Sequence, residues 1–301
     1  MSLANEHHIP VMKDEVVKFL VYNAEGIIVD STLGAGGHTK AILESGFRGK
    51  VIGLDWDPDA ILIANRVLSK YKESVSLHQW NYTRVNDLLD ELGIKSVNGF
   101  LFDLGISSMQ IEDPERGFSY RKDSDLDMRM SKVGRSAKDF LNQASFDELV
   151  FVFTEFGEER FSKRIAKKVI DFRKNVKRVE TTGELNRIIL SCYGIYGRRL
   201  KKHPSSRIFQ AIRIYLNNEI ENLKKGLAEA FRLLKKNGRL VVISYHSLED
   251  RVVKEFIKEK KKEIFSLTKK VVVPAKDEIV INPRARSAKL RAIEKAAGGT
   301  V

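Results

Sequence analysis

The sequence predicts an α/β fold: a mainly parallel, Rossmann-like sheet domain interrupted by an inserted all-helical domain. Short apolar runs alternate with helical patterns up to about residue 103, which is typical of βαβ units. From roughly residue 113 to residue 205, no stretch has the pattern of a strand. Because a connection of that length normally folds into a structure of its own, we expect a split sheet domain with an insertion.

The strands are expected at short apolar runs that end near a polar residue or a glycine. They are residues 27–30, 50–54, 75–79, 99–102 and 239–243. Carboxyl ends of parallel strands meet at one edge of a sheet, so a ligand site is expected there. Residues 271–274 and 279–281 are expected to form an antiparallel pair that closes the sheet.

Helices are expected throughout the insertion and around the fifth strand. Capping boxes at residues 145–148 and 181–184 predict two helix starts. One long amphipathic helix is expected before the fifth strand, ended by a left-handed Gly238 with Lys235 and Lys236 at its negative end. Another helix is expected after Ser244. These patterns place the sheet domain at residues 1–112 and 206–301, and the helical domain at residues 113–205.

A glycine-rich turn, residues 34–38, follows the first strand, and Asp55 ends the second. An acidic side chain at that place can bind ribose hydroxyls. The NAD fingerprint needs a third glycine where this chain has Thr39. The turn therefore resembles the shorter loop of S-adenosylmethionine-dependent methyltransferases. The alternative interpretation is that these glycines only allow the chain to form a tight turn and bind no ligand.

Composition favours a polyanionic partner such as nucleic acid. The chain has 301 residues, with 53 Lys and Arg against 40 Asp and Glu, a net charge of +13 and a pI near 9.6. A thermophile-like charged surface is the alternative, although such surfaces usually balance their signs better. The first residues lack a signal-peptide core and no apolar run is long enough for a membrane span, which predicts a cytoplasmic protein.

Cysteine and histidine usage excludes some chemistries. Cys192 is the only cysteine, so no internal disulfide can form, and we expect it to be a small buried apolar residue rather than a thiolate nucleophile. This argues against cytosine carbon-5 chemistry, which needs such a thiolate. The six histidines lack metal-ligand spacing, so no metal site is predicted.

The fourth strand leads into Asp103, where amino-group methyltransferases usually carry an Asp/Asn-Pro-Pro-aromatic loop. The prolines are missing here. The chemical need is the same, because acceptors must hold the hydrogens of the amine while its nitrogen aligns with the methyl group. Asp103 and nearby carbonyls could supply them. An Asp103 that only caps the turn or binds cofactor fits the residues equally well.

Seven motifs resemble the bacterial 16S ribosomal RNA cytosine-N4 methyltransferase family and keep its order over nearly the whole chain. They are residues 8–12 (HIPVM), 34–38 (GAGGH), 103–108 (DLGISS), 115–119 (ERGFS), 126–130 (LDMRM), 244–251 (SYHSLEDR) and 282–287 (NPRARS). The resemblance implies a class I S-adenosylmethionine-dependent methyltransferase fold, S-adenosylmethionine as methyl donor, and a cytosine at the P site of the decoding centre as substrate.

The resemblance also implies the cofactor residues. They are Gly36, Gly37 and His38 in the glycine turn, Asp55 at the ribose, Tyr82 beside the adenine, and Asp103 and Gln110 at the remaining positions. Asp103 is also the candidate catalytic residue, while no catalytic base is assigned. The helical domain is expected to recognise 16S rRNA, within the 30S subunit or free. The sequence is compatible with a homodimer but does not indicate one.

Two basic runs and three aromatic residues are candidates for RNA contact. They are Arg198, Arg199, Lys201 and Lys202; Arg284, Arg286, Lys289 and Arg291; and Phe118, Tyr120 and Tyr245. The alternative for the basic runs is that they are solvated surface charge, and the alternative for the aromatic residues is ordinary packing. For the whole chain, the alternatives are a DNA amino-methyltransferase, a non-catalytic RNA-binding or ribosome assembly factor, and an NAD-dependent oxidoreductase.

Overall fold

The computed structural model describes residues 9–193 and 203–297, which divide into two compact units. The described residues up to Gly105 and from Ile220 onward form the sheet unit, and residues 106–219 form the helical unit. The expected boundaries at residues 113 and 206 both differ from this division, in which the helical unit begins at residue 106 and ends at residue 219. Helix α10 (Ser205–Leu216) belongs to the helical unit, because its buried face packs against other helices of that unit.

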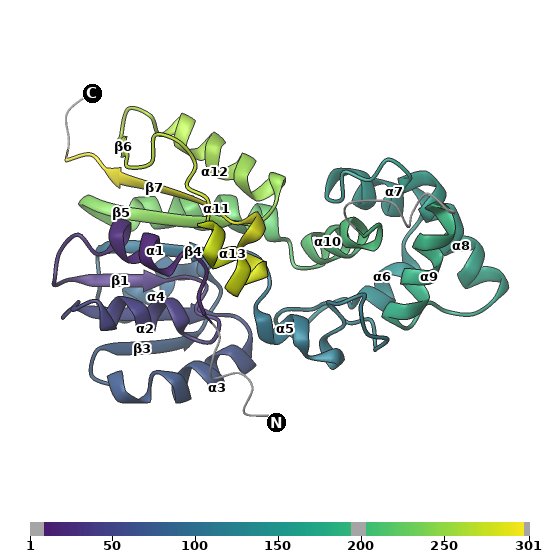
Figure 1. Ribbon diagram of the computed structural model, residues 1–301, viewed down its shortest axis with the longest axis horizontal. Helices are drawn as coiled ribbons and strands as arrows, with labels where there is room; N and C mark the ends of the chain where they lie inside the picture. The colour runs from purple at the N-terminus through teal and green to yellow at the C-terminus, as the bar shows by residue number, and fades with distance from the viewer. Residues whose placement is uncertain (1–8, 194–202, 298–301) are drawn as a thin grey trace. The chain divides into compact units, whose positions relative to one another are not determined.

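The sheet has seven strands in the order β3-β2-β1-β4-β5-β7-β6 (Figure 1). Their bounds are β1 (Ile27–Asp30), β2 (Lys50–Asp55), β3 (Val75–Gln79), β4 (Val97–Asp103), β5 (Leu234–Ser244), β6 (Ile264–Ser266) and β7 (Lys289–Lys295). Strands β1 to β5 are parallel, β7 runs antiparallel to β5, and β6 runs antiparallel to β7. The five strands expected from the apolar runs are confirmed.

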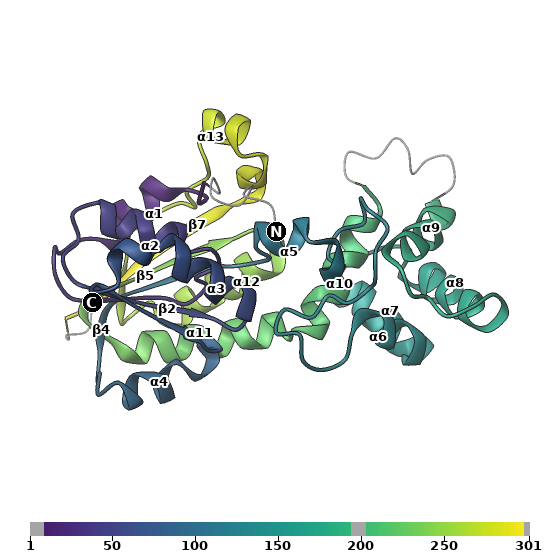
Figure 2. The ribbon, with the colours of Figure 1, turned by 90° about the horizontal axis from the view of Figure 1, so that it is seen from below.

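Helices cover both faces of the sheet, because its central strands are apolar on both faces. In β4, Phe100 and Phe102 face one layer and Leu101 faces the other. The first layer holds α4 (Val85–Glu91), α11 (Glu219–Leu233) and α12 (Ser247–Glu259). The second holds α1 (Lys13–Leu20) and α2 (Gly37–Glu44), and Figure 2 shows the two layers on opposite sides of the strands. A further helix, α3 (Pro58–Val67), joins β2 to β3 through the 3₁₀ turn Ser69–Tyr71.

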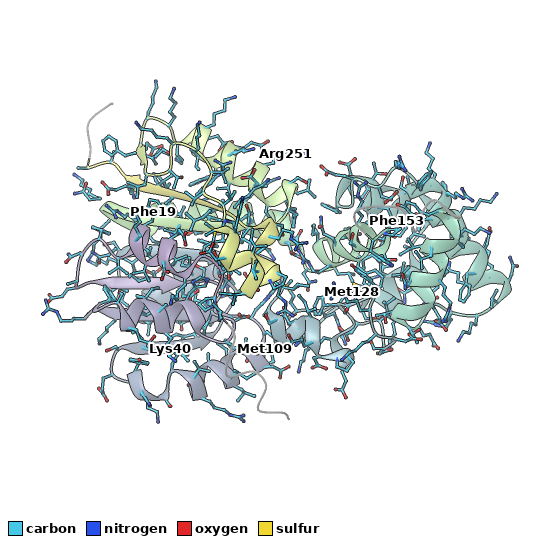
Figure 3. The ribbon with its side chains drawn as sticks, in the orientation of Figure 1. Phe19, Lys40, Met109, Met128, Phe153 and Arg251 are labelled. Carbon is cyan, nitrogen blue, oxygen red and sulfur yellow. The ribbon has the colours of Figure 1, made fainter. Side chains whose placement is uncertain are left out.

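The helical unit contains α5 (Ser108–Glu112), α6 (Ala137–Gln143), α7 (Phe146–Glu155), α8 (Ser162–Asn175), α9 (Thr182–Tyr193) and α10. Both helix starts expected from capping boxes are confirmed. The Ser145 hydroxyl accepts from the backbone N–H of Glu148, and Thr181 Oγ1 accepts from the N–H of Glu184. Phe153, labelled in Figure 3, is fully buried in this unit.

The strand pair expected to close the sheet is wrong. Residues 279–281 end the helix α13 (Lys276–Ile281), and Val272 makes only one bridge, to Leu290. Asp277 and Glu278 lie in the first turn of α13, where acidic side chains stabilise a helix. The closing strands are instead β6 and β7.

The single long helix expected before β5 is also wrong. The chain breaks after α10 at Asn217 and Asn218, and Asn218 has a φ of 50°. Helix α11 then ends at Leu233, directly before β5, so no cap at Gly238 is needed. The positive φ in this region belongs to Asn237, at 61°. The expected helix after Ser244 is confirmed as α12.

None of the helices in the described ranges has the length and apolar character of a membrane span.

Candidate functional site

Three acidic residues lie at the carboxyl edge of the sheet. Asp30 ends β1, Asp55 ends β2 and Asp103 ends β4. Strand pairing places Asp30 beside Gly53 on one side and beside Leu101 on the other. The edge at which the sequence predicts a ligand site therefore gathers the carboxylates of three neighbouring strands.

The glycine turn follows β1 and is joined to the end of β2. Gly34 has a φ of 51° and Gly36 a φ of 83°, conformations that favour glycine. A Cβ on Gly36 would lie 2.9 Å from Cδ1 of Leu68, so the turn also packs closely against the protein. A Cβ on Gly34 would meet nothing within 4 Å, so the turn is open at that position. The N–H of Gly34 donates to Oδ2 of Asp55 at 2.9 Å.

Thr39 has a structural role at the position where an NAD-binding turn would have its third glycine. Its hydroxyl donates to Oδ2 of the buried Asp30 at 2.8 Å. This bond ties the first turn of α2 to the end of β1. Burial raises the pKa of Asp30, although the nearby His38 charge and the hydrogen bonds from Thr39 and Thr32 act in the opposite direction.

Asp55 is held by backbone donors on both of its oxygens. Besides Gly34 on Oδ2, the N–H of Asp57 donates to Oδ1 at 2.9 Å. Burial raises the pKa of Asp55 to about 6, and these two hydrogen bonds partly offset that rise because they favour the ionised form. A pKa of about 6 leaves Asp55 ionised at neutral pH and places its change of charge near pH 6.

The Asp103 carboxylate is held between two side chains from distant parts of the sequence. The Tyr245 hydroxyl donates to Oδ1 at 2.7 Å, and Nε2 of His38 lies 3.4 Å from Oδ2, an ion-pair contact rather than a well-formed hydrogen bond. The backbone N–H of Asp103 also donates to Thr32 Oγ1 at 2.6 Å. Each carboxylate oxygen of Asp103 thus has a defined neighbour.

Burial lowers the pKa of His38, but the contacts and charges of Asp103 and Asp30 outweigh it and raise that pKa overall. Nδ1 of His38 is buried and has no hydrogen-bond partner within the described part of the chain. Burial, followed by the charge of Asp103, raises the pKa of Tyr245 well above its ordinary value, so its hydroxyl stays protonated and can donate.

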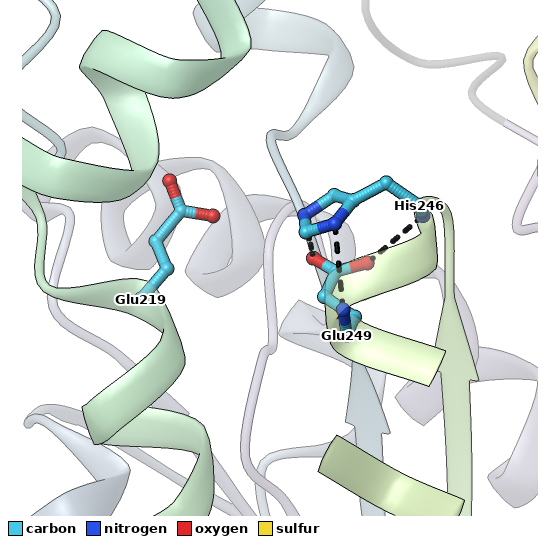
Figure 4. A group of neighbouring side chains, drawn as sticks. All are labelled: Glu219, His246 and Glu249. Atoms are coloured by element: carbon cyan, nitrogen blue, oxygen red, sulfur yellow. Dashed lines mark hydrogen bonds and ion pairs between the residues drawn. The ribbon is translucent and has the colours of Figure 1, made fainter. Parts of the chain in front are cut away.

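The motif at residues 244–251 positions Tyr245 by capping helix α12. The Glu249 carboxylate accepts from the N–H of Tyr245 at 2.7 Å and from the N–H of His246 at 3.3 Å. In return, Nδ1 of His246 accepts from the N–H of Glu249 at 3.4 Å, and Nε2 lies 3.0 Å from Oε1 of Glu249 (Figure 4). This capping box fixes the backbone that carries the Tyr245 ring.

Tyr82 follows β3, and its ring packs tightly against Phe102 and against α11 at Gly226. Its ring meets Phe102 edge to face, with centroids 5.3 Å apart. On α11, a Cβ at Gly226 would lie 2.5 Å from Cδ2 of Tyr82. Only a residue without a side chain fits at position 226 while the ring keeps this place.

Residues 5–296 match the MraW methylase family. The chain belongs to this family. Two relatives named ribosomal RNA small subunit methyltransferase H, from Caldicellulosiruptor bescii and Rickettsia bellii, are each 43% identical over 96% of this chain and cover 99% and 98% of their own lengths. Among solved structures, an rRNA methylase from Streptococcus thermophilus aligns with a TM-score of 0.44 at 12% identity, covering 94% of this chain and 93% of that one.

The family match and the seven-stranded, mainly parallel sheet together confirm the class I S-adenosylmethionine-dependent methyltransferase fold that the motifs imply.

Six of the seven predicted cofactor residues lie in the sheet unit of this methylase. Gln110 lies in the helical unit instead, where its side chain accepts from the N–H of Ser107 and completes the capping box of α5. Its predicted contact with cofactor stays a prediction.

Two of the three aromatic candidates for RNA contact pack against other side chains of the protein. Phe118 is buried with the Arg116 guanidinium over its ring, and Tyr120 stacks on His203 with centroids 4.5 Å apart. These contacts match the packing alternative for both rings. The sequence also missed that Tyr245 binds Asp103. The only signal was its place directly after a strand that neighbours β4.

The two predicted basic runs differ in what the structure shows. Residues 198–202 lie outside the described residues. In the second run, Arg291 contacts the buried Asp250 at 2.8 Å and Lys289 lies 3.5 Å from the same carboxylate. The single charge of Asp250, which Lys254 also contacts, offsets at most one of the four positive charges of that run. Cys192 is buried in α9, as expected.

Proposed function

We propose that this methylase transfers a methyl group from S-adenosylmethionine to the N4 amine of a cytosine at the P site of the decoding centre in 16S rRNA. Membership of the methylase family and the names of the curated relatives support rRNA of the small subunit as substrate. The seven motifs support the cytosine and its atom. Such a substrate would place the protein in the cytoplasm, acting on the 30S subunit or on free 16S rRNA.

The observation that carries this proposal is the acceptor at the end of β4. Asp103 presents a carboxylate at the ligand edge, with one oxygen bound by Tyr245 and the other beside His38. An exocyclic amine needs such an acceptor to hold its hydrogens and direct its lone pair toward the methyl group.

The edge of the sheet fits S-adenosylmethionine. The turn is open at Gly34, and the buried Nδ1 of His38 is left unsatisfied within the described residues. We assign Gly36, Gly37 and His38 to the amino-acid end of the cofactor. We further assign Asp55 to the ribose, Tyr82 to the adenine, and Asp103 and Gln110 to further contacts.

When bound, the cofactor supplies a methyl group on a positively charged sulfur, so methyl transfer to an amine needs no metal for activation. Asp103 would hold the hydrogens of the amine so that its nitrogen lone pair is directed at the methyl group, which leaves the sulfur as it is transferred. The nitrogen then loses a proton to Asp103 or to water. Tyr245 fixes Oδ1 of Asp103, which leaves the orientation of the carboxylate set before substrate arrives.

The test is transfer of labelled methyl groups to unmethylated 30S subunits, free 16S rRNA and DNA, followed by nucleoside analysis. We expect N4-methylcytidine from the ribosomal RNA. Label on DNA alone would favour a DNA amino-methyltransferase, and cofactor binding without any transfer would favour a non-catalytic binding factor.

Asp103→Ala is expected to lower kcat by about 10²- to 10⁴-fold, the usual contribution of a proton acceptor. Tyr245→Phe keeps the ring and the carboxylate, so it should lose less than Asp103→Ala does. An Asp103→Ala enzyme with normal turnover and normal cofactor affinity would remove the role given to this residue.

A further inference from the structure

We propose that the exposed face of helix α8 binds the phosphodiester backbone of the RNA substrate. This inference rests on the proposed function, which makes RNA the substrate. The face consists of Lys163, Arg164, Lys167, Lys168 and Lys174, and we call it the α8 basic face.

The charge of the chain is concentrated around this helix. Residues 160–178 contain nine Lys or Arg residues against one acidic residue, Asp171. This stretch therefore carries a net charge of +8 out of +13 for the whole chain. Helix α8 (Ser162–Asn175) alone holds six of these nine basic residues and Asp171, so it contributes +5.

Helical geometry separates the charges from the core. With 3.6 residues per turn, the α8 basic face spans an arc of about 140° around the helix, and the exposed Asp171 is the one acidic side chain within that arc. The opposite arc carries Ile165, Ala166 and Val169, which are fully buried. Helix α8 packs against α7 and α9 with that apolar side (Figure 1). The charged side is thus presented to solvent on a helix anchored along its length.

Two other basic residues of this stretch have structural partners. Arg173 donates to the carbonyls of Leu141 and Ala144 at 2.6 and 2.7 Å, which satisfies carbonyls at the end of α6. Lys177 pairs with Glu184 at 2.5 Å. By contrast, none of the five residues of the α8 basic face has an ion pair with any residue in the ranges 9–193 and 203–297.

A helix whose charged face contacts only solvent usually carries both positive and negative side chains on that face. Glu to Lys pairs four residues apart stabilise a helix, and like charges at that spacing destabilise it. Here Lys163 and Lys167 are such a like-charged pair, and so are Arg164 and Lys168, while within α8 only Asp171, four residues after Lys167, offsets this repulsion. A polyanion that lies along the helix would remove this repulsion, whereas folding alone gives no reason to keep it.

The dimensions suit a nucleic-acid strand. From Lys163 to Lys174 the helix advances about 16 Å at 1.5 Å per residue. Neighbouring phosphates of one strand lie several ångströms apart, so the α8 basic face can meet more than one phosphate. Binding of this kind releases counterions, so it weakens with salt in proportion to the number of phosphates contacted.

The test compares two double variants of the full-length protein with the same change of charge. Lys163→Gln/Lys167→Gln removes two charges from the α8 basic face. Lys70→Gln/Lys72→Gln removes two exposed charges near the amino end of β3, away from the ligand edge of the sheet. Gln and Lys have similar helix propensities, so both variants should fold. Circular dichroism and S-adenosylmethionine affinity check this.

We expect the α8 variant to weaken binding to 16S rRNA at least about fivefold at low salt, and to reduce the slope of log Kd against log salt by about 1.4 to 1.8. Its KM for RNA should rise while kcat stays near that of the parent. The control variant should keep the parental slope.

An active parent with an α8 variant of unchanged slope and KM would overturn this inference but leave the proposed function intact. Normal binding to free RNA with a loss confined to 30S subunits would overturn it in favour of an acidic ribosomal protein. A parent that methylates no RNA would instead remove the proposed function.

Discussion

Asp103 shows how one residue depends on positions far away in the sequence. Its carboxylate is fixed by Tyr245, which lies 142 residues later, and faces His38 from the glycine turn. The sequence predicts Asp103 and His38 as site residues, because both follow a strand within a recognisable motif. It does not predict the Tyr245 contact, since only the pairing of β4 with β5 brings the ends of those strands together.

Asp55 should make cofactor binding depend on pH. Its pKa of about 6 means that the carboxylate gains a proton as the pH falls below that value. Ribose hydroxyls donate to the ionised form, so protonation should weaken binding by up to about tenfold per pH unit below pH 6. Calorimetric titration with S-adenosylmethionine between pH 5 and 8 measures this, and affinity should level off above about pH 7.

Asp55→Asn is the matched control for this titration. It has a similar shape and cannot ionise, so its affinity should be lower and should lack the step near pH 6. A parental protein with constant affinity from pH 5 to 8 would contradict the assignment of Asp55 to the ribose.

At the level of elements, the sequence predicts those with a strong local pattern and misplaces those that depend on their neighbours. The parallel strands and the capped starts of α7 and α9 have apolar runs and capping residues of their own. Strand β7 alternates charged residues with Leu290 and Ala292, and it is recognised as a strand only through its pairing with β5. Helix α13 is predicted as a strand because its residues 279–281 are all apolar.

Asn217 joins two parts of the helical unit, and its loss should loosen them locally. Its amide donates to the carbonyls of Met128 and Arg213 at 2.8 Å and accepts from the N–H of Met130 at 2.8 Å. Asn217→Ala leaves these buried groups without that partner, at a cost of about 2–4 kcal/mol. Hydrogen exchange at the Met130 amide should become about 10-fold or more faster, while amides of the central sheet keep their protection.

Asn86→Ala offers a comparison for Asn217→Ala. Among residues 9–193 and 203–297, the Asn86 side chain bonds only to Asp90 on the exposed surface of α4, so its loss should leave exchange in the helical unit unchanged. Equal exchange at Met130 in the parent and in Asn217→Ala would show that the bridge does not hold this segment.

For the whole molecule, the sequence located the insertion but not its limits. The predicted end at residue 205 lies before the observed end at residue 219, because the apolar spacing continues from α10 into α11 and hides the break at Asn217 and Asn218. The roles of the two units follow from different properties. The sheet unit has the motifs of a cofactor site, while the helical unit has the densest positive charge.

The net charge of +13 predicts that binding and catalysis have different selectivity. DNA of the same length should compete with RNA for the protein at low salt, because phosphate contacts carry no sequence information. It should receive no methyl groups, since only the correct cytosine reaches the site. Filter binding with labelled RNA and unlabelled DNA at rising salt, together with methyl counting on the DNA, measures both. Efficient methylation of that DNA would contradict the prediction.

Gly226 and the Tyr82 ring compete for the same space, so the size of the residue at one position limits the size that fits at the other. A Cβ on Gly226 would lie 2.5 Å from the Tyr82 ring, which leaves the ring no room to retreat toward α11. With Tyr82 beside the adenine, as proposed, trimming Tyr82 to a small residue would open a hole on the adenine side. Such an enzyme could accept an S-adenosylmethionine analogue with an enlarged adenine that the parent excludes. A label carried by that analogue would then mark only the RNA that this one methylase modifies in a living cell.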